Sequence, residues 1–394
     1  MTNRALFVDD EPNVLDGIRR MLRPLRESWE CEFAPGAREA LSLLEVKLFD
    51  VVVTDMRMPG MDGAQLLAEI CRRWPGVIRI VLSGQSEHEA VVRAVGTSHR
   101  YLAKPCDADS LRQTLEQALV LKSLIQNENV RKLVTSLRTV PTLPKVYEQL
   151  VAELQSPECS IQRIGSIVSA DAGLVARLLQ LVNSAYFGLP RRVTSAAQAA
   201  NLLGLGLLRS LVLAGGVFGQ FGADVMKQLN PERVWDRSTR VASLARLLGQ
   251  HEQCGKDLCE DAFLAGMMQD IGQLVMAHSW PDAYHEVLAL AKAGTPLNSA
   301  EREAFGADHA EVGAYLLGLW NLPAPVIEAV AFHIRYPATP MRLDVSTLVQ
   351  AANLLVSAAD NDPAANQAVA LLAAGPDAER LARWQNLAKT TGAA

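Results

Sequence analysis

The sequence has no Cys-x-x-Cys pair, no long apolar run and no concentration of positive charge. Its six cysteines are scattered, which argues against a cysteine-rich metal site and favours free thiols in a reducing cytoplasm. No apolar stretch approaches the ~18 residues of a membrane span, and no basic segment precedes an apolar one at the N-terminus. The net charge is −5 and neither half of the chain is basic, so a constitutive nucleic-acid surface is not expected. The sequence therefore predicts a cytoplasmic protein that binds neither membrane nor DNA.

The composition is that of a globular chain with more than one core. Hydrophobic residues make up 49% and charged residues 21% of the 394 residues. At roughly 150 residues per domain, this length predicts two or three domains.

Carboxylates follow two of the predicted strands. Val51–Asp55 is a β-branched run that ends in a carboxylate and is followed by Pro59, a pattern typical of a buried parallel strand that opens into a loop. A second apolar run, Ala5–Val8, is followed by Asp9 and Asp10. Because parallel strands end at the same edge of a sheet, we expect the three carboxylates within a few ångströms of one another. Mg2+ would neutralise them, and a carboxylate beside Mg2+ is a competent nucleophile toward a phosphoryl group.

Two later apolar runs are followed by groups that can bind phosphate. Val77–Leu82 is followed by Ser83, and Arg100–Ala103 is followed by Lys104 and Pro105. A hydroxyl and an ammonium group at these strand ends can bind phosphate oxygens. A cis bond before Pro105 would direct Lys104 into the same site.

Strands and helices alternate through the first part of the chain. Strands are predicted at 5–9, 29–34, 51–55, 77–82 and 100–103, with amphipathic helices between them. This alternation predicts a five-stranded, doubly wound parallel sheet of flavodoxin-like order 2-1-3-4-5.

A fifth helix is predicted to begin near Asp107, and its apolar positions continue to Leu137 without Pro or Gly. Residues 121–138 are therefore expected to form a stiff connector helix between two domains. The alternative is a dimer seam, which would make the protein a homodimer.

Residues 1–120 resemble the receiver domain of two-component response regulators. The matching residues are Asp9, Asp10, Asp55, Ser83, Lys104 and Pro105. The resemblance implies that a sensor histidine kinase phosphorylates Asp55, and that Asp9 and Asp10 bind Mg2+ together with the backbone carbonyl of Arg57. It also implies that Ser83 and Tyr101 form the switch pair that responds to phosphate.

From Pro141 onward the pattern is helical. Ser, Asp or Pro residues precede apolar residues at helical spacing, and neither strand alternation nor an internal repeat is present up to about residue 340. An all-α domain is predicted here. Residues 356–394 are expected to form a further helical extension.

Several segments of this part resemble the HDOD domain, a relative of the HD metal-dependent phosphohydrolases. They are Thr139–Pro144, Ser169–Gly188, Ala200–Gly204, Ala262–Gly272, His309–Gly313, Trp320–Pro323, His333 and Ala352–Asn353. The resemblance covers residues 139–355, and the 169–188 segment is its most specific part.

The metal-binding positions of the parent family are degenerate in this sequence. An arginine stands at the upstream histidine position, a glutamine replaces the histidine of the His-Asp pair, and no carboxylate fills the late position. The degenerate site comprises Arg237, Gln269, Asp270, His309, His333 and Asn353. One carboxylate and two histidines are not expected to form a catalytic site, so the domain is predicted to be non-catalytic. The expected structural roles are a helix cap or a hydrogen bond to a neighbouring helix for Asp270, a polar contact for His309 and a core-edge position for His333.

The two resemblances together predict a response regulator that is not an enzyme. Phosphorylation of Asp55 would control how the HDOD domain binds a downstream signalling protein, and relatives of this domain are associated with bacterial signalling and cyclic-dinucleotide pathways. One alternative is a residual metal-dependent phosphohydrolase that acts on a nucleotide. Another is a transcription factor, although no helix-turn-helix with a basic recognition helix is evident.

Overall fold

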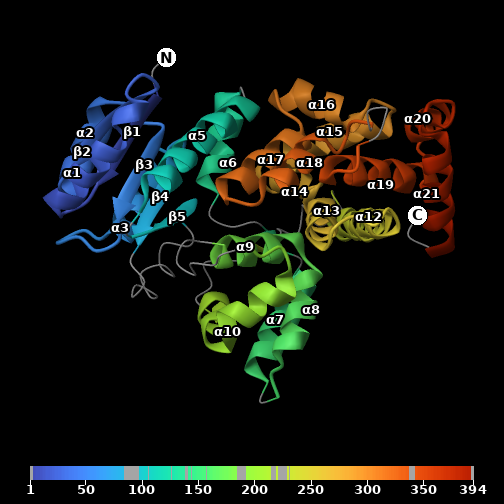
Figure 1. Cartoon of the computed structure of the whole chain (residues 1–394), viewed down its shortest axis with the longest axis horizontal. Helices are drawn as coiled ribbons and strands as arrows, with labels where there is room; N and C mark the ends of the chain where they lie inside the picture. Colours follow the sequence, from blue (N-terminus) through green and yellow to red (C-terminus); the bar gives the residue numbers. More distant parts are fainter. Residues whose placement is uncertain are drawn as a thin grey trace.

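The computed structural model of the chain describes residues 3–83, 97–104, 106–125, 127–137, 141–142, 144–156, 158–183, 192–213, 219–220, 229, 231–336 and 342–391. An α/β domain at the N-terminus lies beside a larger helical domain (Figure 1). No helix within these ranges is both long and apolar enough to cross a lipid bilayer.

The N-terminal sheet is the predicted five-stranded parallel sheet. Its strands are β1 (Asn3–Val8), β2 (Trp29–Ala34), β3 (Val51–Asp55), β4 (Ile78–Ser83) and β5 (Arg100–Ala103). Their spatial order is β2-β1-β3-β4-β5, and every pairing is parallel. Strand β3 is buried at every position, because it lies inside the sheet with helices on both faces. The predicted fold class of this domain is confirmed.

Helices cover both faces of the sheet. They are α1 (Pro12–Met21), the short 3-10 turn Arg23–Leu25, α2 (Ala37–Val46), α3 (Gly63–Arg73) and α5 (Ala108–Leu124). Alternate side chains of β1 separate into two cores, since Phe7 packs with α1 and α5 whereas Leu6 packs with α2 and α3. The two-residue period of the strands therefore fixes which helix each side chain meets.

The loop after β3 is held in place by a glycine and a helix cap. A Cβ atom on Gly63 would lie 2.1 Å from the carbonyl oxygen of Asp55, so only glycine lets α3 start this close to the strand end. Asp62 caps α3 through the backbone N–H of Gln65, and the Gln65 side chain accepts from the backbone N–H of Asp62. This local sequence fixes the backbone beside Asp55.

The connector at 121–138 is not a single helix, so that prediction was wrong. Helix α5 ends at Leu124, Ile125 is extended, and a separate helix, α6 (Glu128–Ser136), begins after Asn127. The Asn127 side chain accepts hydrogen bonds from the first N–H groups of α6 and donates one to the carbonyl of Phe305 in the helical domain. The break is therefore stabilised by a tertiary contact, which the run of apolar residues does not reveal.

The helical domain consists of α-helices with one short strand pair. The helices are α7 (Pro144–Gln155), α8 (Ile161–Ser169), α9 (Ala172–Val182), α10 (Ala196–Leu213), α12 (Pro231–His251), α13 (Lys256–Met268), α14 (Ile271–Ser279), α15 (Pro281–Lys292), α16 (Leu297–Phe305), α17 (His309–Leu319), α18 (Ala324–Phe332) and α19 (Val345–Ala359). Unexpectedly, β6 (Pro141–Thr142) pairs in parallel with β7 (Gly219–Gln220). The prediction of an all-α domain is otherwise confirmed.

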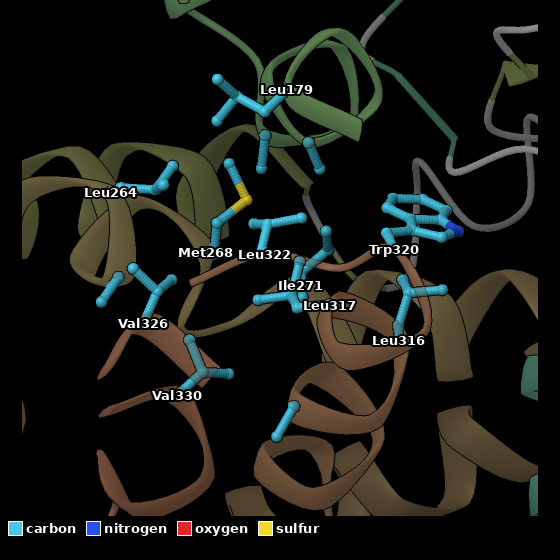
Figure 2. Close-up of a cluster of buried hydrophobic side chains, with 14 of the residues drawn as sticks. Leu179, Leu264, Met268, Ile271, Leu316, Leu317, Trp320, Leu322, Val326 and Val330 are labelled. Atoms are coloured by element: carbon cyan, nitrogen blue, oxygen red, sulfur yellow. The ribbon is translucent and has the colours of Figure 1, made fainter. Parts of the chain in front are cut away.

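The two halves of the helical domain share an apolar core. Figure 2 shows Leu179 of α9 above Met268 of α13 and Leu322, with Leu317 of α17 and Val326 of α18 beneath. All five side chains are at most 2% exposed, and they belong to one buried hydrophobic cluster. Helix α9 belongs to the most specific predicted segment, so that segment serves to pack the first half of the domain onto the second.

The C-terminal extension packs onto the domain. Helix α20 (Pro363–Ala373) and α21 (Ala378–Thr391) follow α19, and the predicted boundary at residue 355 falls inside α19. Leu381 and Trp384 of α21 belong to the main core, and the Trp384 indole N–H donates at 3.0 Å to Glu252, the residue that follows α12. The described part of the extension, residues 356–391, is thus packed into the helical domain.

The two domains touch through β5, α5 and α6 on one side and α17 on the other (Figure 1). Arg100 of β5 is 5% exposed, and its guanidinium donates to the carbonyls of Gly318 and Leu319 at the end of α17. The Gly318 carbonyl also accepts from the backbone N–H of Asn321 at 3.1 Å, and a cation at a helix C-terminus is electrostatically favoured.

A second buried polar contact joins the same elements. Arg79 of β4 is fully buried and donates to the carbonyl of Thr135 in α6 at 2.7 Å. The hydroxyl of Thr135 lies 3.0 Å from that of Tyr315 in α17. His99, next to β5, also contacts the Thr135 carbonyl at 2.8 Å. We call these bonds, together with those of Arg100, the interdomain contact.

Candidate functional sites

The first site lies where β1, β3 and β5 end. Asp9 follows β1 and is fully buried, and Asp55 ends β3 and is 5% exposed. One carboxylate oxygen of Asp9 accepts from the backbone N–H of Glu11 at 2.9 Å. One oxygen of Asp55 accepts from the backbone N–H of Arg57, also at 2.9 Å. Each carboxylate keeps its second oxygen directed into the site.

Lys104 balances these charges. Its Nζ atom lies 2.7 Å from Asp9 Oδ2 and also pairs with Asp55 Oδ1. Burial lowers the pKa of Lys104, but hydrogen bonds and charges from Asp55 and Asp9 outweigh burial and raise it overall. The ammonium group therefore stays charged at neutral pH and holds the two carboxylates side by side.

The remaining receiver-like residues surround this pair. Asp10 is half-buried. The donors are carboxylate oxygens, which fit Mg2+ better than a softer metal. Ser83 ends β4 and its backbone pairs with Ala103. Tyr101 is 5% exposed and packs in the core shared with α2 and α3. Pro105 lies outside the described residues.

The second site is a polar cluster in the helical domain. It unites all six residues of the predicted degenerate site: Arg237 from α12, Gln269 and Asp270 between α13 and α14, His309 from α17, His333 after α18, and Asn353 from α19. Asp270, His309 and His333 form the one group among the described residues in which three metal-ligand side chains have donor atoms within 4.8 Å of one another. Apart from Arg237, whose side chain is 29% exposed, these charged and imidazole groups are buried.

Arg237 binds one side of this cluster. Its guanidinium donates to Asp270 Oδ2 at 2.9 Å, to Asn353 Oδ1 at 2.6 Å and to the hydroxyl of Ser357 at 2.9 Å. Gln269 also donates to Asp270 Oδ2, at 3.0 Å. The positions that differ from the parent family are thus linked to one another by hydrogen bonds.

The two histidines lie on the other side of Asp270. Their Nε2 atoms are 3.7 Å (His309) and 3.6 Å (His333) from Asp270 Oδ1. The Nδ1 atom of His309 is 2.6 Å from Glu301 Oε2, and that of His333 is 2.8 Å from the carbonyl oxygen of Val330. Each imidazole therefore has one nitrogen engaged by an acceptor and the other turned toward Asp270.

Close helix packing brings His309 to this position. A Cβ atom on Gly272 would lie 1.9 Å from the carbonyl oxygen of His309, so a glycine is needed where α14 meets α17. Asp270 precedes α14 and its side chain makes no capping bond there, but it accepts a hydrogen bond from Arg237 of the neighbouring α12, which is the second of its two expected roles. His309 is buried in polar contact, in agreement with its expected role, whereas His333 is 1% exposed and lies deeper than the expected core edge; both face the same carboxylate.

Opposite charges stabilise the ionised forms in the cluster. Burial raises the pKa of Asp270, but Arg237 and the two histidines outweigh burial and hold it well below its ordinary value. Burial lowers the pKa of His309, but Glu301 and Asp270 raise it to about 9. Without a metal ion, His309 is therefore an imidazolium between two carboxylates at neutral pH.

Sequence reasoning missed the residues that support the cluster. Glu301 is fully buried and accepts hydrogen bonds from the Tyr284 hydroxyl at 2.7 Å and from the backbone N–H of His309 at 3.0 Å. Gln273 donates to Asp270 Oδ1 at 2.7 Å. The available signal was the position of Glu301 in α16. It lies four residues after Leu297 and four before Phe305, on the apolar face of an amphipathic helix.

Family comparisons match both parts of the chain. The model of the response regulator receiver domain matches residues 5–116, and that of the HDOD domain matches residues 140–336. In solved structures, the MmoQ response regulator of Methylococcus capsulatus superposes with a TM-score of 0.50 at 23% identity, covering 63% of this chain and 93% of that chain. This likeness shows a shared fold.

Curated relatives match smaller shares of their own length. An uncharacterized protein of Treponema pallidum (strain Nichols) is 27% identical over 307 residues, which are 75% of this chain and 56% of the relative. The hydrogenase transcriptional regulatory protein HoxA of Cupriavidus necator is 33% identical over 180 residues, which are 44% of this chain and 36% of the relative. The chain thus spans about half or less of the length of these relatives.

The receiver sheet with its buried aspartates defines a signalling protein of the response-regulator class. The chain belongs to the HDOD family, since the HDOD match covers half of it, and it joins an N-terminal receiver domain to a C-terminal HDOD domain.

Proposed function

We propose that a sensor histidine kinase phosphorylates Asp55 in the cytoplasm. Asp9, Asp10 and Asp55, with the backbone carbonyl of Arg57, would hold the Mg2+ that supports the transfer. The supporting observation is the buried Asp9–Lys104–Asp55 arrangement, in which one oxygen of Asp55 stays directed into the site. Mg2+ supplies charge neutralisation for the incoming phosphoryl group.

The phosphate would act through β4 and β5. Ser83 and Lys104 would bind its oxygens, and Tyr101 would repack with them. Two new hydrogen bonds to a charged group contribute about 1.5–3 kcal/mol each. A shift from 1:99 to 99:1 between two states needs about 5.5 kcal/mol, so two such bonds nearly suffice.

The observation that carries the proposed output is the interdomain contact. Strands β4 and β5 have the phosphate-binding positions at their carboxyl ends, whereas Arg79 and Arg100 lie at their amino ends and reach α6 and α17. A shift of these strands would change hydrogen bonds at the end of α17. We infer that phosphorylation controls which surface the HDOD domain presents to a downstream protein.

We propose that the HDOD domain acts by binding a downstream protein and not by catalysis. Arg237, Gln269 and Asn353 stand where the parent family has metal ligands, and their side chains form hydrogen bonds instead. The partners to test first are proteins of cyclic-dinucleotide signalling, which the HDOD resemblance names. The second candidate function is a residual phosphohydrolase, and the convergence of Asp270, His309 and His333 is the observation that favours it.

Hydrogen exchange of the full chain with Mg2+, with and without beryllofluoride, tests the proposal. We expect changed protection in β5, α6 and the end of α17, and none of these changes in Asp55→Asn. Changes confined to the receiver domain would contradict control of the HDOD domain. Partner capture that is the same for the wild type and Asp55→Asn under phosphorylating conditions would do so as well.

A further inference from the structure

His99 uses all four of its hydrogen-bonding groups at the junction of the domains. It precedes β5, is 2% exposed, and its backbone N–H donates to the carbonyl of Arg79 at 2.8 Å. Its Nδ1 atom lies 2.9 Å from the backbone nitrogen of Arg79, and its Nε2 atom lies 2.8 Å from the carbonyl oxygen of Thr135 in α6. Its own carbonyl accepts from the side chain of Gln180 in α9 at 3.2 Å. This one residue therefore connects β4 of the receiver domain with α6 and with the first half of the helical domain.

The partners of the ring define its protonation state. The backbone N–H of Arg79 can only donate, so Nδ1 of His99 accepts and carries no hydrogen. The carbonyl of Thr135 can only accept, so Nε2 carries a hydrogen and donates it. The imidazole is therefore neutral, in the Nε2–H tautomer, while the interdomain contact is formed. A further proton could bind only at Nδ1, where it would meet the N–H of Arg79.

A buried positive charge lies against the ring. Nη2 of the fully buried Arg79 is 3.0 Å from His99 Nε2 and donates to the same Thr135 carbonyl at 2.7 Å. The hydroxyl of Tyr315 in α17 lies 3.0 Å from that of Thr135, and burial raises the pKa of Tyr315, so this group stays neutral. Arg131, one turn before Thr135 on α6, adds a second cation within electrostatic reach of Tyr315. An imidazolium at this position would be repelled by the guanidinium of Arg79.

We propose that His99 makes the interdomain contact sensitive to pH. Uptake of one proton at Nδ1 breaks its hydrogen bond with Arg79 and places two buried cations side by side, so the docked state binds this proton less tightly than the undocked state. Docking is therefore fully stabilised above the ordinary histidine pKa of about 6.5 and weakens as the pH falls below it. This response is separate from phosphorylation of Asp55, which lies at the opposite ends of the parallel strands.

Nuclear magnetic resonance of the full chain, labelled with 15N at histidine and arginine, tests the state of the ring. At neutral pH we expect the chemical shifts of a neutral Nε2–H imidazole, with a scalar coupling between Nδ1 of His99 and the amide nitrogen of Arg79 across their hydrogen bond. Both signals should lose intensity together as the pH is lowered. The coupling identifies His99 without any substitution, so this measurement decides even if a variant fails to fold. A hydrogen on Nδ1 at neutral pH would overturn the proposal.

Hydrogen exchange over the same pH range measures the docking itself. Protection factors, corrected for the intrinsic pH dependence of exchange, should fall about tenfold per pH unit below about pH 6 in α6 and at the end of α17, because opening takes up one proton. Protection in β1 and β3 should stay constant. His99→Gln keeps a donor for Thr135 but has no group that titrates, so it should lose most of this pH dependence. The control His285→Gln, at an exposed position of α15, should keep it.

Other groups that titrate in this range are common to the proteins compared. Burial raises the pKa of Asp261 to about 6, but this carboxyl is present in the wild type and in both histidine variants, so its effect cancels. Circular dichroism checks the fold of each variant. Wild-type protection that is independent of pH in α6 and α17 would overturn the proposal. Protection that falls as steeply in His99→Gln as in the wild type would do so too.

Discussion

Replacing Arg100 with methionine should loosen the interdomain contact without disturbing the site at Asp55. The side chain is 5% exposed and bonds to the carbonyls of Gly318 and Leu319 and to Gln117 Oε1, the last at 2.7 Å. Methionine keeps the length of the chain but removes every donor. Two helix-terminal carbonyls and one amide oxygen then lose the Arg100 donors, although the Gly318 carbonyl keeps the backbone N–H of Asn321.

The magnitude follows from these losses. Hydrogen bonds to a charged group contribute about 1.5–3 kcal/mol, and a cation at a partly buried helix C-terminus up to about 2 kcal/mol. Burial and the nearby Arg192 lower the pKa of Arg100 to about 10, so the wild-type side chain is still charged at neutral pH but incurs a desolvation cost that methionine avoids. We therefore expect a net loss of about 2–4 kcal/mol in the free energy of unfolding.

Urea unfolding of the full chain measures this loss, and hydrogen exchange locates it. Amides at the end of α17 should exchange faster in Arg100→Met, whereas β1 and β3 should be unchanged. The matched control is Arg112→Met on α5, whose side chain is 48% exposed in a surface ion pair and should matter by less than about 0.5 kcal/mol. A loss no larger than that of the control, or unchanged exchange at α17, would refute the idea that Arg100 joins the domains.

The other predictions concern pH, close packing and the C-terminal helix. Burial, followed by the charge of Asp257, raises the pKa of Asp261 from 3.8 to about 6, so the folded state binds this proton more tightly than the unfolded state. Stability should therefore fall as pH rises from about 4 to 6, and Asp261→Asn should exceed wild-type stability above pH 6 but not below pH 4; equal stability at pH 8 would contradict this. Gly272→Ala should destabilise the chain by more than about 3 kcal/mol because its Cβ would lie 1.9 Å from a backbone oxygen, whereas Gly17→Ala, with open space around it in α1, should stabilise by about 0.5–1 kcal/mol. Thermal melts that rank the two glycine variants the other way would count against the packing described for α14 and α17. Trp384→Ala should lower the free energy of unfolding by about 3–5 kcal/mol, because a fully buried indole and its hydrogen bond are lost. A melting temperature lowered no more than by an alanine substitution at a surface position would show that α21 is not part of the domain.

The receiver domain could be predicted from the sequence because its geometry follows from local rules. Apolar runs that alternate with amphipathic helices specify a parallel sheet, and parallel strands present their carboxyl ends at one edge. Asp9, Asp55 and Lys104 each follow such a run, so their meeting required no knowledge of which helices pack together.

The cluster around Asp270 was decided by the tertiary structure. Its members lie on different helices, and a helical period identifies an apolar face without specifying which other helix covers that face. Glu301 was missed for the same reason, since only packing places it beside His309. The family resemblance named the cluster residues but did not show that they share one carboxylate.

The break between α5 and α6 shows the same limit. Ile125 and Asn127 interrupt the connector although no Pro or Gly is present, because the amide of Asn127 bonds to Phe305, far along the chain. The sequence by itself therefore determined the two domains and the site at the sheet edge, where the order of residues along the chain dictates their neighbours. The tertiary structure decided the interdomain contact and the polar cluster, because the energies that stabilise them come from residues that meet only when the helices pack.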